Sequence, residues 1–315
     1  MQINYIILTH KNPIQLERLI SKLEDKDVTF FVHIDAKANI ESFKYLEKDN
    51  VIFLENRVDV IWGDFSIVQA TLNAMKSVIE HRDQGYTILL SGQDYPIKSK
   101  QEIKNYLQEN QNFDFIEFRK VETVWETYRE RTIARKLNLS SKKGMYVTIF
   151  SIPDIHNFRE FYVSCKNVLK FFIHSAFKNY TKIIPFLFKK RKPLVDCQYA
   201  GSAWWAFQHS TVIKILELIT TKKEVIDYYK ECLLPDEIFF QTLINSIPNY
   251  KIQVKDSITY VNWERKNCPL PVTFDGNDLQ EILKQPENKL FARKFDIDLN
   301  SSSILDEIDR LIHLK

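Results

Sequence analysis

The chain has 315 residues, of which 44% are hydrophobic and 27% charged, and this ordinary globular composition excludes a largely disordered protein. The formal net charge of +3 is too small to indicate a nucleic-acid-binding protein, so we expect no nucleic-acid partner and only local recognition of anions. Four widely spaced cysteines without a C-x-x-C pair exclude the usual zinc and redox motifs and indicate reduced thiols in a cytosol.

The first residues, "MQINYIILTH", are typical of a buried strand and lack the long apolar region of a signal peptide. No run in the sequence reaches transmembrane length. We therefore expect a cytoplasmic protein that is neither secreted by that route nor membrane-spanning.

Up to about residue 120, strand-like and helix-like segments alternate, which predicts a parallel sheet with crossover helices. The segments that resemble buried strands are Ile3–His10, Val28–Asp35, Val51–Glu55, Tyr86–Gly92 and Phe113–Phe118. The segments "NPIQLERLISKLE" and "FSIVQATLNAMKSVIEHR" are predicted helices. Only six glycines occur, in neither a dinucleotide-binding nor a P-loop motif, so phosphates must be bound in another way.

From about Val121 to Pro193 the pattern is irregular and basic, and we interpret this region as an insertion. Order resumes with a predicted strand at Tyr199–Gln208, followed by the helices "STVIKILELI" and "EVIDYYKECL", and one or two strands within Tyr250–Trp263. The helix "SILDEIDRLI" is predicted near the end. Because no internal repeat or flexible linker is evident, we predict a single domain over 1–315.

Pro235, Asp236 and Glu237 stand at the head of the otherwise apolar stretch Leu233–Ile244, which predicts a helix. Proline suits the first turn, aspartate can cap the helix, and glutamate in the first turn meets the positive end of the helix dipole. Taken alone, the pattern favours this structural interpretation, because capped helix starts far outnumber catalytic ones.

Four stretches change that balance because they occur together and in a fixed order. They are "FVHIDAKA" (Phe31–Ala38), "LLSGQDYPIKS" (Leu89–Ser99), "GSAWWAF…LLPDEIFFQT" (Gly201–Thr242) and "LFARKFD" (Leu290–Asp296). Together they resemble the core-2/I-branching N-acetylglucosaminyltransferases of glycosyltransferase family 14 and the related peptide O-xylosyltransferases, and the chain would be a bacterial member. The resemblance covers roughly residues 3–296.

The resemblance implies an α/β protein of the GT-A glycosyltransferase fold, with a central, mainly parallel twisted sheet flanked by helices. It also implies an inverting enzyme that moves a sugar from a UDP-sugar to a glycan hydroxyl, forms a β linkage and needs no metal or other cofactor. N-acetylglucosamine is the first expected donor sugar and xylose the second. Residues 1–120 would bind the UDP-sugar, 121–198 would shape the acceptor side, and 199–315 would supply the catalytic base and the phosphate contacts.

The resemblance gives Glu237 the role of catalytic base, because the base of these enzymes is the glutamate of the same Pro-Asp-Glu stretch. Direct displacement at an anomeric carbon requires a carboxylate that deprotonates the incoming hydroxyl. Burial beside Ile238, Phe239 or Trp204 would raise the pKa of Glu237 towards neutrality. Asp236 keeps its expected capping role.

Asp35 and Trp62 are the candidates for binding uridine. Asp35 follows a predicted strand, at the sheet edge where ligands of open α/β sheets bind. In the resembling enzymes this aspartate accepts a hydrogen bond from uracil, and Trp62 falls where an aromatic ring packs on the nucleoside. A turn-capping aspartate and a core tryptophan are the alternatives.

Metal-dependent GT-A enzymes usually carry Asp-x-Asp after the strand that here reads "YTILLSG", because two carboxylates hold the cation that bridges the diphosphate. This chain has "SGQD" instead, which leaves Asp94 alone. We therefore predict no metal site. Asp94 is expected to hydrogen-bond the donor sugar or ribose, with a turn-forming role as the alternative.

Without a metal, fixed cations must neutralise the departing UDP. The resemblance assigns a phosphate contact to Lys294, and alternation along a strand points the adjacent Arg293 to the opposite face, so only one of them should face the diphosphate. Arg265 in "NWERKNCP" is the nearest candidate for a second cation, with a solvated loop as its alternative.

The candidate acceptor-binding residues are Glu117, Trp125, Arg129, Arg131 and Trp204. Glu117 falls near a glutamate that binds acceptor hydroxyls in the resembling enzymes. Because Trp204 and Trp205 are adjacent on a predicted strand, only one of them can meet a sugar while the other belongs to the core.

The segment Lys166–Lys192 contains eight Lys or Arg and no acid, interleaved with Phe, Ile and Leu. This composition predicts peripheral contact with an anionic membrane at its cytoplasmic face, which would present the enzyme to a lipid-linked glycan. A basic face that packs on the domain is the alternative.

Two other classes of function are also considered. A catalytically inactive UDP-sugar-binding or glycan-binding protein of the same fold is disfavoured by the presence of Glu237 and Lys294. A nucleotidyltransferase would require a glycine-rich phosphate loop near the N-terminus and a metal pair, and the sequence shows neither.

Overall fold

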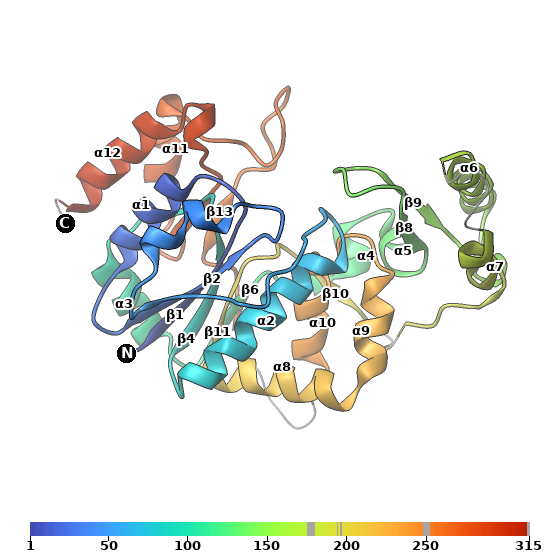
Figure 1. The fold of residues 1–315 in the computed structure, drawn as a ribbon, viewed down its shortest axis with the longest axis horizontal. Helices are drawn as coiled ribbons and strands as arrows, with labels where there is room; N and C mark the ends of the chain where they lie inside the picture. Colours follow the sequence, from blue (N-terminus) through green and yellow to red (C-terminus); the bar gives the residue numbers. More distant parts are fainter. Residues whose placement is uncertain (175–179, 194, 196, 248–252, 314–315) are drawn as a thin grey trace.

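The computed structural model describes residues 1–174, 180–193, 195, 197–247 and 253–313 (Figure 1). At its centre is a seven-stranded sheet in the order β12-β6-β11-β4-β1-β2-β3. The strands are β1 (Ile3–Thr9), β2 (Val28–Ile34), β3 (Val51–Phe53), β4 (Tyr86–Ser91), β6 (Asp114–Ile116), β11 (Trp205–Gln208) and β12 (Val254–Lys255). Only β11 runs antiparallel to its neighbours, β4 and β6. The predicted α/β class, with a central, mainly parallel sheet flanked by helices, is confirmed.

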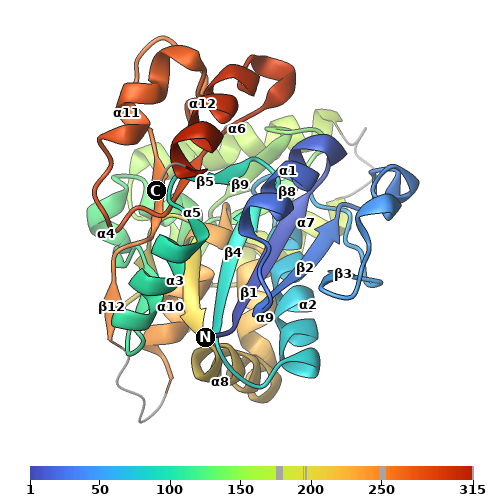
Figure 2. The same ribbon diagram turned by 90° about the vertical axis from the view of Figure 1, so that its left-hand side faces the viewer.

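The central strands are apolar on both sides because helices cover both faces of the sheet. Side chains alternate along β1, so that Tyr5 and Ile7 join one hydrophobic core and Ile6 joins the other. The first core is covered by α1 (Pro13–Leu23), α3 (Lys100–Glu109), α11 (Leu279–Leu283) and α12 (Ser302–His313). The second is covered by α2 (Phe65–His81), α8 (His209–Thr221), α9 (Lys223–Lys230) and α10 (Phe239–Asn245) (Figures 1 and 2).

A smaller sheet lies beyond the carboxyl end of β4. It consists of β13 (Thr259–Val261), β14 (Phe291–Arg293) and β5 (Asp94–Pro96). In its antiparallel pairing of β14 with β5, Arg293 is opposite Asp94. This register brings a cation from the end of the chain against a carboxylate that follows a central strand.

The predicted strand Tyr199–Gln208 is two strands, β10 (Tyr199–Ala200) and β11, joined by an irregular turn. β10 pairs with β7 (Arg119–Lys120) in a separate two-stranded sheet. Gly201 begins the turn, and a Cβ atom there would lie 2.2 Å from the carbonyl oxygen of Glu117. The strand is interrupted where the backbones approach so closely that only glycine fits.

The region interpreted as irregular is largely ordered. It contains α4 (Val121–Val124), α5 (Tyr128–Thr132), the hairpin β8 (Arg135–Asn138) and β9 (Tyr146–Ile149), α6 (Phe158–His174) and α7 (Tyr180–Phe188). A small core of its own includes Val147, Ile149, Phe171 and Ile183. In Figure 1 these helices and the hairpin lie together at the end of the molecule away from α12. The sequence interpretation missed α6 because its lysines and aromatic side chains were taken as part of an irregular, basic region.

The predicted helix at Leu233–Ile244 is also divided. A single 3-10 turn, Pro235–Glu237, precedes α10, and its N-cap residue is Leu234 in a left-handed conformation (φ 52°). The capping role expected for Asp236 is therefore wrong, because Asp236 lies inside this turn rather than before it. Its Oδ1 atom is buried without a hydrogen-bond partner among the described residues.

Candidate active site

The candidate residues gather at the carboxyl ends of the parallel strands. His10 follows β1, Asp35 follows β2, and Ser91 ends β4. The chain continues from β1 to β2 on one side, whereas β4 pairs with β1 on the other, so the strand order reverses between β1 and β4. Open α/β sheets bind ligands at such a switch point.

Arg293 is fixed at this edge by three neighbours. Its Nη1 atom donates to Asp94 Oδ1 at 2.9 Å and also to the Ser91 hydroxyl, and its guanidinium lies over the Trp204 ring at 4.2 Å from the centroid. In the part of the chain that the structure describes, Nε and Nη2 have no hydrogen bond. These groups can bind an anion without disturbing the pair with Asp94.

Asp94 has no exposed surface, and its Oδ2 atom accepts a hydrogen bond from the Ser91 backbone amide. Burial raises the pKa of Asp94, and the adjacent Arg293 opposes this shift. The prediction that Asp94 contacts the donor directly is therefore corrected: both of its oxygens bond to protein, and it forms the turn and holds Arg293.

Lys294 extends the positive charge of this edge. Burial lowers the pKa of Lys294, and the charges of Arg293 and Lys143 lower it further. Within the described residues Lys294 makes no ion pair. A lysine that lies beside two other cations and has no ion pair of its own among the described residues is suited to binding an anion such as a diphosphate.

Lys143 comes from the loop of the β8–β9 hairpin, and its Nζ atom lies 5.0 Å from the centroid of the Trp62 ring. Trp62 is 43% exposed, which excludes the core alternative considered for it. Lys143 was not predicted from the sequence. The signal that could have found it is the basic turn "SSKKG", in which Gly144 has a φ of +77°.

Arg265, the second cation predicted for the diphosphate, has other partners. Its Nη2 atom donates to Asp278 at 2.6 Å and to Glu281 at 2.8 Å. Two carboxylates therefore already neutralise this guanidinium, so the structure corrects the prediction and leaves Arg265 with a structural role.

Glu237 is paired with Arg131, whose Nη1 atom donates to Glu237 Oε2 at 2.6 Å. The Arg131 guanidinium stacks on the Trp125 ring at 3.7 Å from its centroid, which fixes the cation from behind. Burial raises the pKa of Glu237, whereas Arg131 lowers it and the charge of Glu117 raises it. Arg131 and Trp125 were predicted to bind the acceptor, but in the structure they position the carboxylate.

Asp236 and Glu237 form an adjacent pair of carboxylates. Burial and the negative charge of Glu237 raise the pKa of Asp236 to about 7, while Arg131 and Arg293 act in the opposite direction. Residues 201–204 link this pair to Arg293, because the Gly201 amide donates to the Glu237 carbonyl at 3.0 Å and the Trp204 ring lies under the Arg293 guanidinium.

Glu117 lies on the same side of the site. Its Oε2 atom accepts from the Ser202 amide at 2.9 Å, and the adjacent Gly201 amide donates to the carbonyl of Glu237 at 3.0 Å. The turn after β10 thus ties the two glutamates together.

The remaining predicted residues are placed as follows. Arg129 donates to Glu160 at 2.7 Å, so its predicted acceptor role is replaced by an ion pair that holds α6. Trp204 is buried under Arg293 rather than open to a sugar, and Trp205 stacks on Phe207 at 4.1 Å within the core, as predicted. Asp35 accepts from the Lys37 amide at 2.8 Å, a turn geometry compatible with both interpretations of this residue.

Among the described residues, no group of three His, Cys, Asp or Glu side chains is placed to hold a metal ion. In the same residues, no helix is both long enough and apolar enough to cross a membrane.

A family model described as "Branch: Core-2/I-Branching enzyme" matches residues 3–283. The chain belongs to this family. Curated members similar to it include Xylosyltransferase 1 of Rattus norvegicus, which is 22% identical over 99% of this chain and 36% of its own length. Xylosyltransferase 2 of Rattus norvegicus is 23% identical over 98% of this chain and 33% of its own length. The chain spans about a third of the length of these relatives.

Among solved structures, 4-diphosphocytidyl-2C-methyl-D-erythritol synthase aligns with a TM-score of 0.36 and 8% identity. The alignment covers 90% of this chain and all of that one.

We predict that Arg131→Ala raises the pKa of Glu237. Removing the cation removes the influence that lowers this pKa, so the carboxylate becomes ionised only at higher pH. The measurement is an NMR titration of the Glu237 carboxyl group across a pH series. Arg310→Ala, which removes an exposed arginine of α12, is the matched control. A pKa of Glu237 that stays in place, or falls, would contradict the assigned pairing.

Proposed function

We propose that this protein is an inverting glycosyltransferase of GT-A fold that transfers a sugar from a UDP-sugar to a glycan hydroxyl. The observation that carries the proposal is the link, through residues 201–204, between Glu237, a buried carboxylate with a raised pKa, and Arg293, which directly precedes Lys294. A base and an anion site at the switch point of an α/β sheet are the two elements that direct displacement of a nucleotide requires. Membership of the Core-2/I-Branching enzyme family supports the same reaction.

In the proposed reaction, the acceptor hydroxyl oxygen attacks the anomeric carbon of the donor sugar. Its proton passes to the Glu237 carboxylate as the new carbon–oxygen bond forms. The bond between the anomeric carbon and the β-phosphate oxygen breaks on the opposite side, so the configuration inverts. Lys294 and the free donors of Arg293 stabilise the negative charge that develops on the departing UDP.

The adjacent acid supports this step. With Asp236 holding a proton up to about pH 7, the pair carries one net negative charge rather than two beside the reacting hydroxyl. Arg131 fixes the orientation of Glu237 through a single short hydrogen bond, which keeps the second carboxylate oxygen available for the acceptor.

The donor is proposed to be a UDP-sugar, with uracil bound at Asp35 and the nucleoside against Trp62. Burial of the Asp35 carboxylate at the end of β2 and the 43% exposure of Trp62 support this placement. N-acetylglucosamine is the first candidate sugar, from the resemblance to the branching enzymes. Xylose is the second, and the names of the curated relatives argue for it. An assay of UDP release must therefore include both donors.

The absence of a metal requirement is also part of the proposal. A hard divalent cation takes several oxygen ligands, and both oxygens of Asp94 already bond to Arg293 or Ser91. The residues at this position therefore do not fit a metal-bridged diphosphate, and the fixed cations fit it instead.

A binding protein without turnover is the alternative class, and the assay distinguishes it directly. Such a protein would bind the UDP-sugar but release no UDP when a glycan acceptor is added. Release that depends on the acceptor supports the transferase.

We predict that Glu237→Gln reduces the transfer rate by roughly 10²–10⁴-fold while UDP affinity stays near normal, because the amide keeps the shape but cannot accept the proton. The comparison requires single-turnover transfer and calorimetric binding of UDP. Glu122→Gln, at an exposed glutamate of α4, is the matched control and should be unaffected. Near-normal turnover of the Glu237 variant would assign the base elsewhere.

We predict that Lys294→Ala weakens UDP-sugar binding by roughly 10- to 100-fold and also slows the chemical step, since a charge-assisted contact to phosphate strengthens as the leaving group departs. Lys266→Ala, which removes an exposed lysine beside Arg265, is the control. Titration of UDP and of the UDP-sugar, followed by pre-steady-state transfer, separates the two effects. Unchanged affinity would place the diphosphate away from Lys294.

We predict that transfer survives EDTA and is little stimulated by Mg²⁺ or Mn²⁺. The physical reason is that the "SGQD" segment offers one carboxylate, which is already bonded to Arg293. The measurement is the initial transfer rate with EDTA and after readdition of each cation. Loss of activity in EDTA with recovery in Mn²⁺ would restore Asp94 to the role of a metal ligand.

A further inference from the structure

The outer side of α6 carries an unusual apolar stripe. Eight of the sixteen large hydrophobic side chains exposed in the described residues lie between positions 152 and 188. Five of them are on α6, at positions 3, 1, 7 and 4 residues apart, and this spacing places them on one face of the helix. They are Phe158 (79% exposed), Phe161 (51%), Tyr162 (59%), Leu169 (58%) and Ile173 (66%).

The stripe is separate from the side of α6 that stabilises the fold. Phe171 packs on the β8–β9 hairpin, Ser164 accepts from the Phe150 amide at 3.1 Å, and Asn167 donates to the Thr148 carbonyl at 2.7 Å. The buried side therefore accounts for the folding of α6 and leaves the exposed stripe without a role in it.

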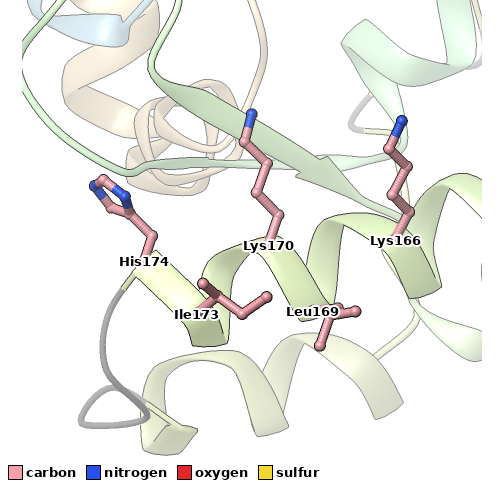
Figure 3. Close-up of a pocket in the computed structure, with 5 residues that line it drawn as sticks. All are labelled: Lys166, Leu169, Lys170, Ile173 and His174. Atoms are coloured by element: carbon pink, nitrogen blue, oxygen red, sulfur yellow. The ribbon is translucent and has the colours of Figure 1, made fainter.

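Positive charge lies beside the stripe. Lys166, Lys170 and His174 are one turn apart, and with Leu169 and Ile173 they line an open hollow. Figure 3 shows the two lysines extending to the same side of α6. The one acid between residues 158 and 192 is Glu160, and it is buried in its pair with Arg129. No carboxylate from this stretch offsets the lysines.

We propose that this α6 surface docks on an anionic lipid bilayer. The apolar side chains would enter the interfacial layer, while the lysine stems lie along them and the ammonium groups meet the headgroup phosphates. Charge complementarity selects this occupant over a second copy of the chain. In a two-fold contact through the same surface, Lys166 and Lys170 of one copy would face the same lysines of the other copy, and these like charges would repel each other.

The proposal assigns membrane contact to only part of the predicted basic segment Lys166–Lys192. Arg191 is buried and donates to the carbonyls of Ala134 and Tyr228, so it does not face a membrane. Residues 175–179 of the predicted segment lie outside the described residues. The docking surface consists of the outer side of α6.

The β8–β9 hairpin connects the α6 docking surface to the candidate site. α6 packs on β9, and the loop of the same hairpin carries Lys143 to Trp62. Docking through α6 would hold the acceptor side of the site at a set orientation to the bilayer. The inference that the acceptor is a glycan attached to lipid rests on the proposed function, whereas the docking itself does not.

The experiment is co-sedimentation of the full chain with vesicles, in the absence of any sugar nucleotide. We expect binding to vesicles of mixed phosphatidylglycerol and phosphatidylcholine at low salt, and little binding to phosphatidylcholine alone. Lys166→Glu with Lys170→Glu should weaken binding by roughly tenfold or more, and Leu169→Ser with Ile173→Ser should also weaken it.

The matched controls carry the same changes on exposed residues elsewhere: Lys222→Glu with Lys223→Glu, and Leu283→Ser with Leu299→Ser. They should bind vesicles like the wild type, and thermal melting and circular dichroism should show that every variant is folded. The proposal is overturned if the wild type does not bind anionic vesicles, or if the control and α6 variants lose binding equally.

Two further outcomes would assign the surface to another occupant and so overturn the proposal. Displacement from vesicles by millimolar inorganic phosphate at constant ionic strength would indicate a site for a free anion. Light scattering that shows a dimer converted to a monomer by Leu169→Ser with Ile173→Ser would indicate contact between copies. A negative vesicle result would leave the transferase proposal standing, because UDP release is measured with a soluble acceptor.

Discussion

The buried charge of Asp94 is the constraint on which the candidate site depends. A carboxylate with no exposed surface needs a cation and hydrogen-bond donors, and removal of one partner from a buried pair typically costs about 3–5 kcal/mol. Arg293 and the Ser91 amide meet this need. Because Arg293 ends β14, the pair also sets the register of β14 against β5 and places Lys294 beside it. The need to neutralise the buried Asp94 carboxylate therefore also fixes the position of Lys294 in the candidate site.

Glu237 differs from Asp94 in its hydrogen bonds rather than in the direction of its pKa shift, because burial raises the pKa of both carboxyl groups. The Glu237 carboxylate has one cation, Arg131, which lowers its pKa, and the charge of Glu117 adds to the effect of burial. Asp94 is compensated on both oxygens and is unsuited to proton transfer, whereas Glu237 keeps one oxygen without a described hydrogen bond. The two acids differ in their surroundings rather than in their chemistry, and only Glu237 has an oxygen available for the proton transfer proposed for it.

Local patterns predicted the elements and the strand ends, but they could not predict pairs formed by distant segments. The strands through β4 and the position of Asp35 follow from apolar runs that end in polar residues. Arg131 meets Glu237 across 106 positions, and no spacing rule indicates that contact. Arg265 was misassigned for a different reason. Asp278 and Glu281 lie 13 and 16 positions after it in the chain, and both accept hydrogen bonds from its guanidinium. The capping role of Asp236 was misassigned because the N-cap residue of the 3-10 turn is Leu234, in a left-handed conformation. Asp236 lies within that turn.

Within the insertion, the β8–β9 hairpin connects α6 to the loop that carries Lys143. The hairpin core fixes α6 from one side and fixes the loop that carries Lys143 from the other. A displacement of α6 would therefore be transmitted through β9 to the side chain that covers Trp62, because packed elements move as units rather than deform continuously. If α6 rests on a bilayer, the same four-residue strands set the position of Trp62 relative to that bilayer. The distance between the bilayer and the candidate site then depends on the hairpin rather than on the central sheet.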